Sequence, residues 1–303
     1  MLGKNRWSKV AVLDPEKIDW AKYLAPTDRA RVVSAASLAG ACRALLAPTS
    51  PPPGLVFPWD KSRGKVLIEP GKVAVWCGWS HAGKSSLLRQ LMLHAIDQGE
   101  RVLIASMEED LRQIWLELAI LYAGAPTPAP STLDEFTAFI RESLWFYDQA
   151  GVVAANRMLA VCRYAAETHG ITQVVIDSLM MLAINRDNYD AQSEFMTALK
   201  ACAADTGQTI HLVAHFRKSE RGAEERPGNA HDIAGGHEIG SKADYIFNIW
   251  RDKNPPPDKP ACILSVEKQR GRIHWLGKLG LQYHEPSGQF VEDRRSPLTF
   301  GKT

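Results

Sequence analysis

The sequence is short of three things: long apolar runs, an excess of one charge, and cysteine pairs. No apolar segment approaches the roughly 18–20 residues that a membrane-spanning helix needs. The chain carries 36 Lys and Arg against 34 Asp and Glu, which gives a net charge of +2. General attraction to a polyanion is therefore weak, and any contact with nucleic acid must come from a local basic patch.

The patterns of a secretory leader and of a disulfide framework are missing as well. Residues 1–20 include acidic side chains and no continuous apolar core, unlike a signal peptide. The 5 cysteines are scattered and form no CxxC pair, at Cys42, Cys77, Cys162, Cys202 and Cys262. We therefore expect a cytoplasmic protein whose thiols are reduced and mostly buried.

What is present is the composition of a folded chain. Of its 303 residues, 45% are hydrophobic and 23% are charged, which argues against disorder and against a fibre. We predict an N-terminal arm over residues 1–54 and one domain over residues 55–303. Residues 28–46 are predicted to form one helix, followed by a proline-rich tether over residues 47–54. This helix is either a docking arm or folded back on its own domain.

From residue 55 onward, short apolar strands alternate with helical stretches, which predicts a mostly parallel sheet flanked by helices. We expect strands at residues 73–77, 102–106, 144–147, 173–177 and 209–215, and helices at residues 83–96, 111–122, 156–168 and 191–205. Further strands, closing the sheet with an antiparallel tail, are expected at residues 245–250, 262–266, 272–276 and 281–284. Two polar stretches, 185–190 and 216–240, are expected to be loops between elements.

A phosphate-binding loop is predicted where the first of these strands meets a helix. The segment GWSHAGKS, residues 78–85, matches GxxxxGK[ST], with a strand before it and a helix after it. Lys84 should reach the β- and γ-phosphates of a nucleotide, and the Ser85 hydroxyl should hold Mg²⁺. The nucleotide-binding residues expected along this turn are Gly78, Ser80, Gly83, Lys84, Ser85 and Ser86. The competing interpretation is a loop with only a structural role.

Two carboxylates follow strands of the same predicted sheet. Asp177 ends the apolar strand at residues 173–177, where it could hold Mg²⁺ through a water molecule. Glu108 follows the strand at residues 102–106, where an acid could orient the water that attacks a phosphate. Glu109 and Asp110 are expected to be acids of the next helix's first turn. The alternative is that all three acids serve the helix.

With these motifs placed, the chain resembles the hexameric replicative DNA helicases of the DnaB/Twinkle class, in the RecA-like ATPase superfamily. It is most like the helicase half of Twinkle-like phage helicase–primases. The resemblance covers about residues 55–292 and also rests on residues 57–61, 212–218, 232–244 and 268–270. It implies an α/β RecA-like P-loop NTPase core, with antiparallel C-terminal strands and a short N-terminal helical arm.

The resemblance implies roles for five side chains. Glu108 would be the catalytic glutamate, and His215 would contact the γ-phosphate and link it to the DNA-binding loops. Lys268 and Arg270 would reach into the neighbouring subunit's ATP, where an arginine stabilises the charge that develops during phosphoryl transfer. Tyr283 would stack on the base. The alternatives are that His215 is an exposed strand end, that residues 268–272 form a basic hairpin tip, and that Tyr283 is a packing residue.

Residues 216–242 correspond to the loop that lines the central channel of the resembled rings. The DNA-binding residues it implies are Arg217, Lys218, Arg221, His237 and Lys242. Ala234 stands where the resembled pattern has a basic residue, so His237, Lys242 or backbone N–H groups would have to substitute. Three acids, Glu220, Glu224 and Glu225, dilute the charge and favour a solvated loop as the competing interpretation.

The resemblance implies an ATP- and Mg²⁺-dependent DNA helicase that forms a homo-oligomeric, hexameric ring. It would translocate 5′→3′ on single-stranded DNA at a replication fork, with a primase and a polymerase as further partners. The helix at residues 28–46 would pack on the adjacent subunit, and the location would be the host cytoplasm if the chain is phage-encoded. The 54 residues of the arm leave no room for the primase region of those relatives. Two alternatives stay open, a RecA/RadA-type DNA-dependent ATPase or recombinase, and a nucleotide-switched helicase loader or regulator.

Overall fold

The computed structural model describes residues 12–13, 19, 36, 39–40, 43, 53–184, 188–217, 226–234, 237–256, 259–292 and 296–301. The helix predicted at residues 28–46 and its tether lie outside the described residues, apart from isolated positions. The same holds for Cys42, Lys218, Arg221 and the side chain of His237. The predicted domain boundary at residue 54 therefore stays a prediction.

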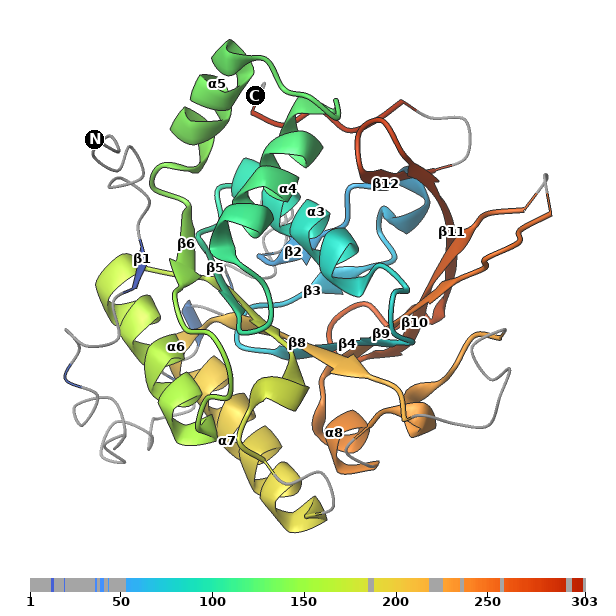
Figure 1. The fold of residues 1–303 in the computed structure, drawn as a ribbon. Helices are drawn as coiled ribbons and strands as arrows, with labels where there is room; N and C mark the ends of the chain where they lie inside the picture. The colour runs from blue at the N-terminus through green and yellow to red at the C-terminus, as the bar shows by residue number, and fades with distance from the viewer. Residues whose placement is uncertain are drawn as a thin grey trace.

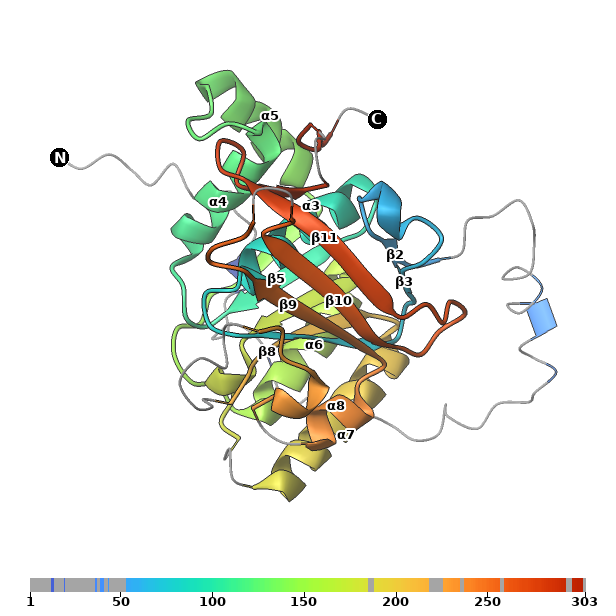
Figure 2. The ribbon, with the colours of Figure 1, turned by 90° about the vertical axis from the view of Figure 1, so that its right-hand side faces the viewer.

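A 10-stranded sheet forms the middle of the described structure (Figures 1 and 2). Its order is β1-β6-β5-β7-β8-β4-β9-β10-β11-β12. The pairs from β1 to β9 are parallel, and the pairs from β9 to β12 are antiparallel. In that order the bounds are Val12–Leu13, Leu144–Tyr147, Val102–Ser106, Gln173–Asp177, Thr209–His215, Val73–Gly78, Tyr245–Arg251, Cys262–Gln269, Gly277–His284 and Gln289–Val291. A separate pair joins β2 (Leu55–Val56) to β3 (Leu67–Ile68).

Helices cover both faces of the sheet (Figure 1). One apolar core lies under α3 (Lys84–Asp97), α4 (Leu111–Ala123) and α5 (Pro130–Ile140). The other core lies under α6 (Ala155–His169), α7 (Tyr189–Thr206) and α8 (His237–Lys242). Because both faces are covered, β4, β5 and β6 are buried along their whole length, which explains their continuous apolar sequences. Short 3₁₀ turns lie at Asp60–Ser62, Leu179–Met181 and Ala230–Asp232.

The predicted mostly parallel sheet with an antiparallel tail is confirmed, but its last part differs in detail. The strand predicted at residues 272–276 is wrong, since β11 begins at Gly277. Instead of pairing in the sheet, the carbonyl of Trp275 accepts a hydrogen bond from the side chain of Gln269. The Trp275 ring also lies where a side chain on Gly277 would be, 2.2 Å from an added Cβ. The predictions did not include α5, α8 or β12.

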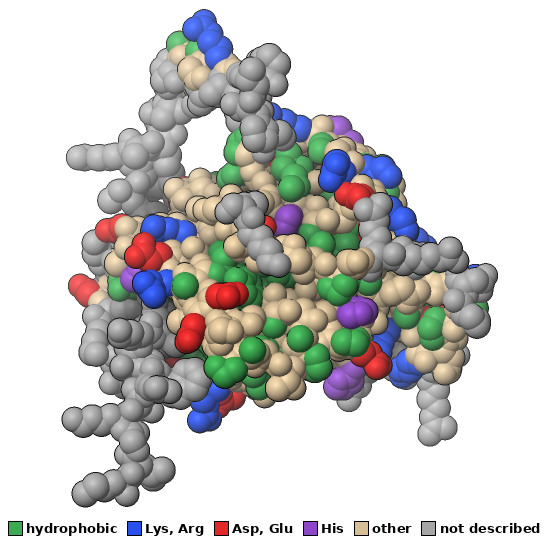
Figure 3. Space-filling view, turned by 90° about the horizontal axis from the view of Figure 1, so that it is seen from above, with side chains coloured by type: hydrophobic (Ala, Val, Ile, Leu, Met, Phe, Trp, Pro, Cys, Tyr) green, Lys and Arg blue, Asp and Glu red, His purple; other side chains and the backbone are tan. Residues whose placement is uncertain are grey.

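The thiols agree with the expectation where the structure describes them. Cys77, Cys162, Cys202 and Cys262 are free and buried. Among the described residues, no helix combines the length and apolar character needed to cross a bilayer. On the face shown in Figure 3, described acidic and basic side chains lie in small separate groups. The described part of this face therefore carries no broad field of one sign, in line with the small net charge.

A polar network is buried in the centre of the sheet. The Trp76 Nε1–H donates to Nδ1 of His211 at 3.0 Å, so the Nε2–H of His211 donates to Gln173 at 2.9 Å. His211 is completely buried, and this burial lowers its pKa to about 3. The network joins β4, β8 and β7, the three strands whose ends carry the candidate site.

The lowered pKa of His211 predicts a loss of stability in acid. The folded chain keeps this imidazole neutral, so its contribution is complete above the ordinary value of 6.5 and is lost as the pH falls toward about 3. Within that range, this group should lower the free energy of unfolding by up to about 1.4 kcal/mol per pH unit. Urea denaturation from pH 7 to about pH 5 measures the slope.

The slope should become smaller in His211→Gln, which lacks the titrating group. It should be unchanged in His274→Gln, which replaces an exposed histidine. An NMR titration that finds the folded His211 half-protonated near its ordinary pKa contradicts the prediction.

Candidate nucleotide site

The phosphate loop leaves the sheet at the end of β4 and becomes α3. β4 lies between β8 and β9, so the loop starts from the centre of the sheet. An added Cβ on Gly78 would lie 2.3 Å from the carbonyl oxygen of Ile249 on β9. Gly83 has a left-handed φ of 90°, and an added Cβ there would lie 2.8 Å from the Phe290 ring. Only glycine suits either position, and the turn directs the loop toward the N-terminus of a 14-residue helix, which favours anions.

Lys84 places its ammonium inside this loop. Its Nζ donates to the carbonyl oxygens of Gly78 at 3.2 Å and Trp79 at 2.8 Å, and lies 3.4 Å from Nδ1 of His215. The residue is 5% exposed, and this burial lowers its pKa to about 8. A partly desolvated cation thus stands among carbonyl groups at the place where the sequence predicts phosphates.

The magnesium residues predicted from the sequence lie together. The Ser85 side chain hydrogen-bonds to Asp177, and both line a cavity of about 10 Å³ with Ser106, room for about one water molecule. The buried Ser106 hydroxyl has no hydrogen-bond partner among the described residues. Burial raises the pKa of Asp177, while the Ser85 hydrogen bond opposes this rise. An ion here would favour the charged carboxylate.

This donor set fits Mg²⁺ and does not fit a metal held by protein alone. Among the described residues, no group of three or more His, Cys, Asp or Glu side chains is placed to hold a metal ion. Mg²⁺ usually keeps several waters and takes one or two protein ligands together with substrate phosphates. Ser85 and Asp177 would hold such an ion, and the Ser106 hydroxyl is placed to accept or donate to one of its waters.

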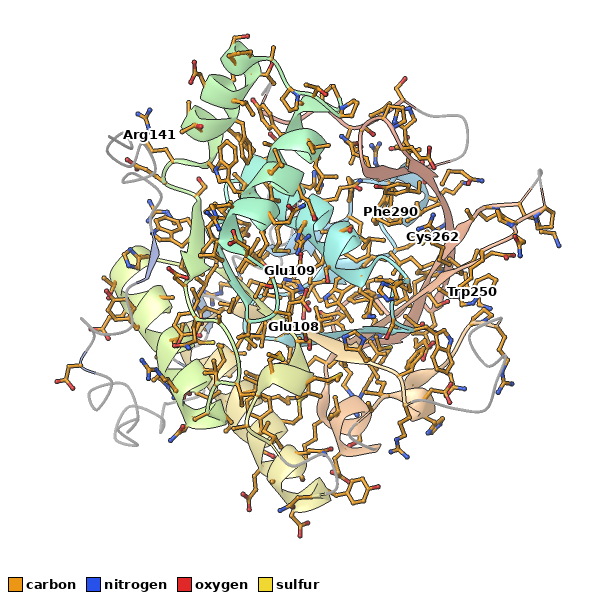
Figure 4. All side chains as sticks on the ribbon, in the orientation of Figure 1. Glu108, Glu109, Arg141, Trp250, Cys262 and Phe290 are labelled. Carbon is orange, nitrogen blue, oxygen red and sulfur yellow. The ribbon has the colours of Figure 1, made fainter. Side chains whose placement is uncertain are left out.

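The three acids after β5 are used in three different ways. Asp110 is the N-cap of α4, where its side chain accepts from the N–H of Arg112. Glu109 is paired with the buried Arg89 of α3 at 2.5 Å, and Arg89 also binds Glu117 of α4. Glu108 is exposed, and Figure 4 shows it beside Glu109 in the middle of the molecule. Neither acid lies in the first turn of α4, since Asp110 caps the helix from the position before it and Glu109 joins α3 to α4.

Glu108 is held in place by a serine at the end of the neighbouring strand. Ser178 is fully buried, and its hydroxyl donates to Oε1 of Glu108 at 2.7 Å. The sequence favours Ser178 as a helix N-cap, with a polar contact to the site as the alternative. It precedes a 3₁₀ turn but makes no side-chain cap there. Its hydroxyl leaves the second carboxylate oxygen of Glu108 open to a water molecule.

His215 connects the site to the segment that follows β8. It ends β8 beside Lys84, and the next residue, Phe216, forms a bridge with Ile233. The backbone N–H of Arg217 donates to the carbonyl oxygen of Asp232, and the Arg217 side chain is exposed. Arg217, the first basic residue of the predicted DNA-binding loop, is therefore joined to the nucleotide site through Phe216 and His215.

Two predicted contact residues instead have partners within the chain. All three hydrogens of the Lys242 ammonium are used on α7, by the carbonyl and hydroxyl of Ser193 and the hydroxyl of Thr197. Lys268 donates to the carbonyl oxygens of Gly240 and Ser241 at 2.8 and 2.7 Å. Both lysines thus fasten α8, and the contacts predicted for them with DNA and with a neighbouring ATP stay predictions.

Arg270 differs from its predicted partner Lys268. Its side chain is exposed just beyond β10, and its backbone N–H donates to the carbonyl oxygen of Asp244. Burial lowers the pKa of Lys268 to about 8, and Arg270 contributes to the same shift. Of the two residues, Arg270 is the more exposed.

One aromatic ring, that of Phe290, lies between Tyr283 and the phosphate loop. Its side chain is 38% exposed on β11 and meets Phe290 edge to face, with ring centroids 5.4 Å apart. Phe290 in turn lies against Gly83. The guanidinium of Arg251 stands 5.7 Å from the Tyr283 centroid. An exposed ring beside the loop suits the predicted stacking role.

The sequence interpretation missed several groups of this site, namely Trp79, Arg89, Ser106 and Phe290. Arg89 carried a signal, since it falls among Leu87, Leu88 and Leu91 on a helix that is buried nearly all round. A charged residue at such a position indicates a buried ion pair. Ser106 also carried a signal, because it is the polar residue that ends an apolar strand.

The chain has relatives among known proteins. Residues 56–221 match the AAA domain family. The chain is 23% identical over 213 residues to a DNA helicase/primase of Enterobacteria phage T3, a match that takes in 64% of this chain and 37% of the phage protein. The chain thus spans little more than a third of that relative's length.

Solved structures share the fold. The ATPase domain of G40P has a TM-score of 0.71 at 16% identity, over 85% of this chain and 97% of that one. A DnaB-like replicative helicase, described with its interactions with primase, has a TM-score of 0.70 at 17% identity, over 86% of this chain and 67% of that one. The predicted RecA-like fold and the resemblance in fold to DnaB-like proteins are confirmed.

The position of Glu108 predicts the effect of removing its charge. Glu108→Gln keeps the size of the side chain and can still accept from Ser178, so nucleotide binding should stay within a few-fold. Hydrolysis of ATP should fall by at least about 100-fold, because general-base catalysis typically contributes this much. Fluorescent-nucleotide binding and phosphate release measure the two quantities. Glu142→Gln, at an exposed acid far along the chain, is the control. Normal turnover by E108Q removes Glu108 from the role.

Proposed function

The chain belongs to the AAA domain family, and we propose that it is an ATP-driven replicative DNA helicase that forms a ring and translocates on single-stranded DNA. The observation that carries this proposal is the meeting of Lys84, Asp177, Glu108 and His215 at the carboxyl edge of one parallel sheet. Support comes from the named relatives, a phage helicase/primase and DnaB-like ATPase domains.

In the proposed reaction, the phosphate loop binds the triphosphate and Lys84 exchanges a loop carbonyl for a phosphate oxygen. Ser85 and Asp177 would hold Mg²⁺, and a bound ion would supply positive charge that neutralises the negative charge of the phosphates. Glu108, oriented by Ser178, positions the attacking water and accepts its proton. His215 lies next to the Lys84 ammonium and senses whether a γ-phosphate is present.

The site is completed by a second copy of the chain. Arg270 is exposed at the end of β10, where it can reach a neighbour, while Lys268 holds α8 in its own chain. A head-to-tail contact of this kind closes into a ring when the rotation allows it. We propose a hexamer that moves 5′→3′ along single-stranded DNA, with Arg217 among the residues that contact its backbone. A primase and a polymerase are proposed partners.

The function is tested on a forked duplex. ATP hydrolysis should be stimulated by single-stranded DNA and should separate the strands of the fork, whereas Lys84→Ala should do neither. Stimulated hydrolysis without strand separation would instead indicate a RecA/RadA-type ATPase. Slow hydrolysis that single strands do not stimulate would indicate a nucleotide-switched loader or regulator.

The proposed role of Arg270 is tested in mixed assemblies. Arg270→Ala should lower ATP hydrolysis by about 1000-fold or more, as for other arginine fingers. Mixing it with Lys84→Ala should restore part of the activity, because an intact site then forms between one R270A copy, which supplies Lys84, and one K84A copy, which supplies Arg270. Arg272→Ala, two residues further on, is the control. Mixed assemblies without any regained turnover would place the function of Arg270 within one chain.

A further inference from the structure

Trp79, the second residue of the phosphate loop, contacts both ends of the segment that begins at Arg217. Its Nε1–H donates to the backbone oxygen of Arg226 at 3.2 Å. Its ring meets the Phe216 ring edge to face, with centroids 5.1 Å apart. One side chain of the nucleotide site therefore touches the chain immediately before and immediately after residues 217–225.

The contact with Phe216 is tightly packed. Phe216 is 6% exposed, and its ring lies so close to Gly228 that an added Cβ there would be 2.2 Å away. The Phe216 N–H donates to the carbonyl oxygen of Gly78, at the start of the phosphate loop. A shift of the Trp79 ring would therefore press on Phe216, which has no free space to absorb it.

The far side of the segment is fastened to the sheet. Asn248 of β9 donates to the carbonyl oxygen of Gly228 and, at 2.8 Å, to Glu267 of β10. The other oxygen of Glu267 accepts from the N–H of Ala230 at 2.7 Å. Residues 228–230 are thus tied to two buried strands. If the phosphate loop moves relative to these residues, the contacts of Trp79 must change.

Phosphate binding acts directly on Trp79. The Trp79 carbonyl accepts the shorter of the two hydrogen bonds that Lys84 gives to the loop. A phosphate oxygen competes for the same ammonium, and taking it releases the Trp79 carbonyl. This route shares the Lys84 ammonium with the contact to His215 and differs from it in passing through the Trp79 carbonyl.

We propose that Trp79 is a positioning residue that couples nucleotide binding to single-strand binding by holding both ends of the segment from Arg217 to Arg226. The proposal rests on the proposed function and deepens it. It requires a coupling free energy between the two ligands that depends on the Trp79 side chain, and this coupling must be the same whichever ligand is measured.

The test compares the affinity for a fluorescein-labelled oligodeoxythymidylate with saturating ATPγS and Mg²⁺ and without nucleotide. In the wild-type protein the nucleotide should change the dissociation constant by at least about 10-fold. Trp79→Ala should reduce this ratio to below about 2-fold, and Trp79→Phe, which keeps the ring contact but loses the hydrogen bond, should give an intermediate ratio. Trp145→Phe, a tryptophan on β6, should behave as the wild type.

The reciprocal measurement, of a fluorescent ATP analogue with and without the oligonucleotide, should give equal ratios. A merely structural role would change both affinities and leave their ratio intact, which overturns the inference while the proposed function stands. If W79A does not fold, an unchanged ratio in both W79F and Phe216→Leu overturns it equally. A wild-type protein whose oligonucleotide affinity ignores the nucleotide overturns the inference and the coupled motor together.

Discussion

The ammonium of Lys84 is a positive charge that the fold has taken almost wholly out of water, and the groups around it follow from that. An unpaired ammonium would lose several kcal/mol of solvation, so the carbonyl oxygens of Gly78 and Trp79 accept from it. Asp177 and Glu108 lie close enough to favour its charged form, yet burial dominates and keeps its pKa near 8. Such a cation gains from any further negative charge. The residue that costs stability in the folded chain is therefore the one that favours a phosphate.

Arg89 is a second buried cation, and the structure treats it in the opposite way. Two carboxylates, of Glu109 and Glu117, already surround it, so it has little to gain from a ligand. It ties α3, which starts at the phosphate loop, to α4 and to the turn after β5. Glu109 is thereby fixed, and its neighbour Glu108 is held by Ser178 at the adjacent strand end. The ion-paired Arg89 thus stabilises the scaffold of the site. The charge of Lys84 is only partly neutralised, so Lys84 remains available to bind a ligand.

The sequence was sufficient for the part of this arrangement that depends on local pattern. Apolar strands that end in Gly78, Asp177 and His215 could be recognised singly, and parallel pairing brings their carboxyl ends to one edge. Contacts between residues distant in sequence could not be foreseen. Phe290 reaches Gly83 across more than 200 residues, and Lys268 and Lys242 find partners on α8 and α7 that no spacing indicates. The sequence pattern at residues 272–276 is typical of a strand, but the side chain of Gln269 binds the carbonyl oxygen of Trp275. A local pattern cannot predict this hydrogen bond.

The two halves of the site differ in exposure, and this difference bears on regulation. The groups expected to bind phosphate and Mg²⁺, Lys84 and Asp177, are largely buried in one chain, whereas Glu108 and Arg270 are exposed. Water weakens electrostatic stabilisation at exposed groups, and its exclusion strengthens it several-fold. In the proposed ring, a neighbour would cover Glu108 while it delivers Arg270. A single chain would then bind the nucleotide, whereas fast hydrolysis would require the assembly. ATP would therefore be hydrolysed mainly in the proposed ring, the state in which DNA can pass through the channel.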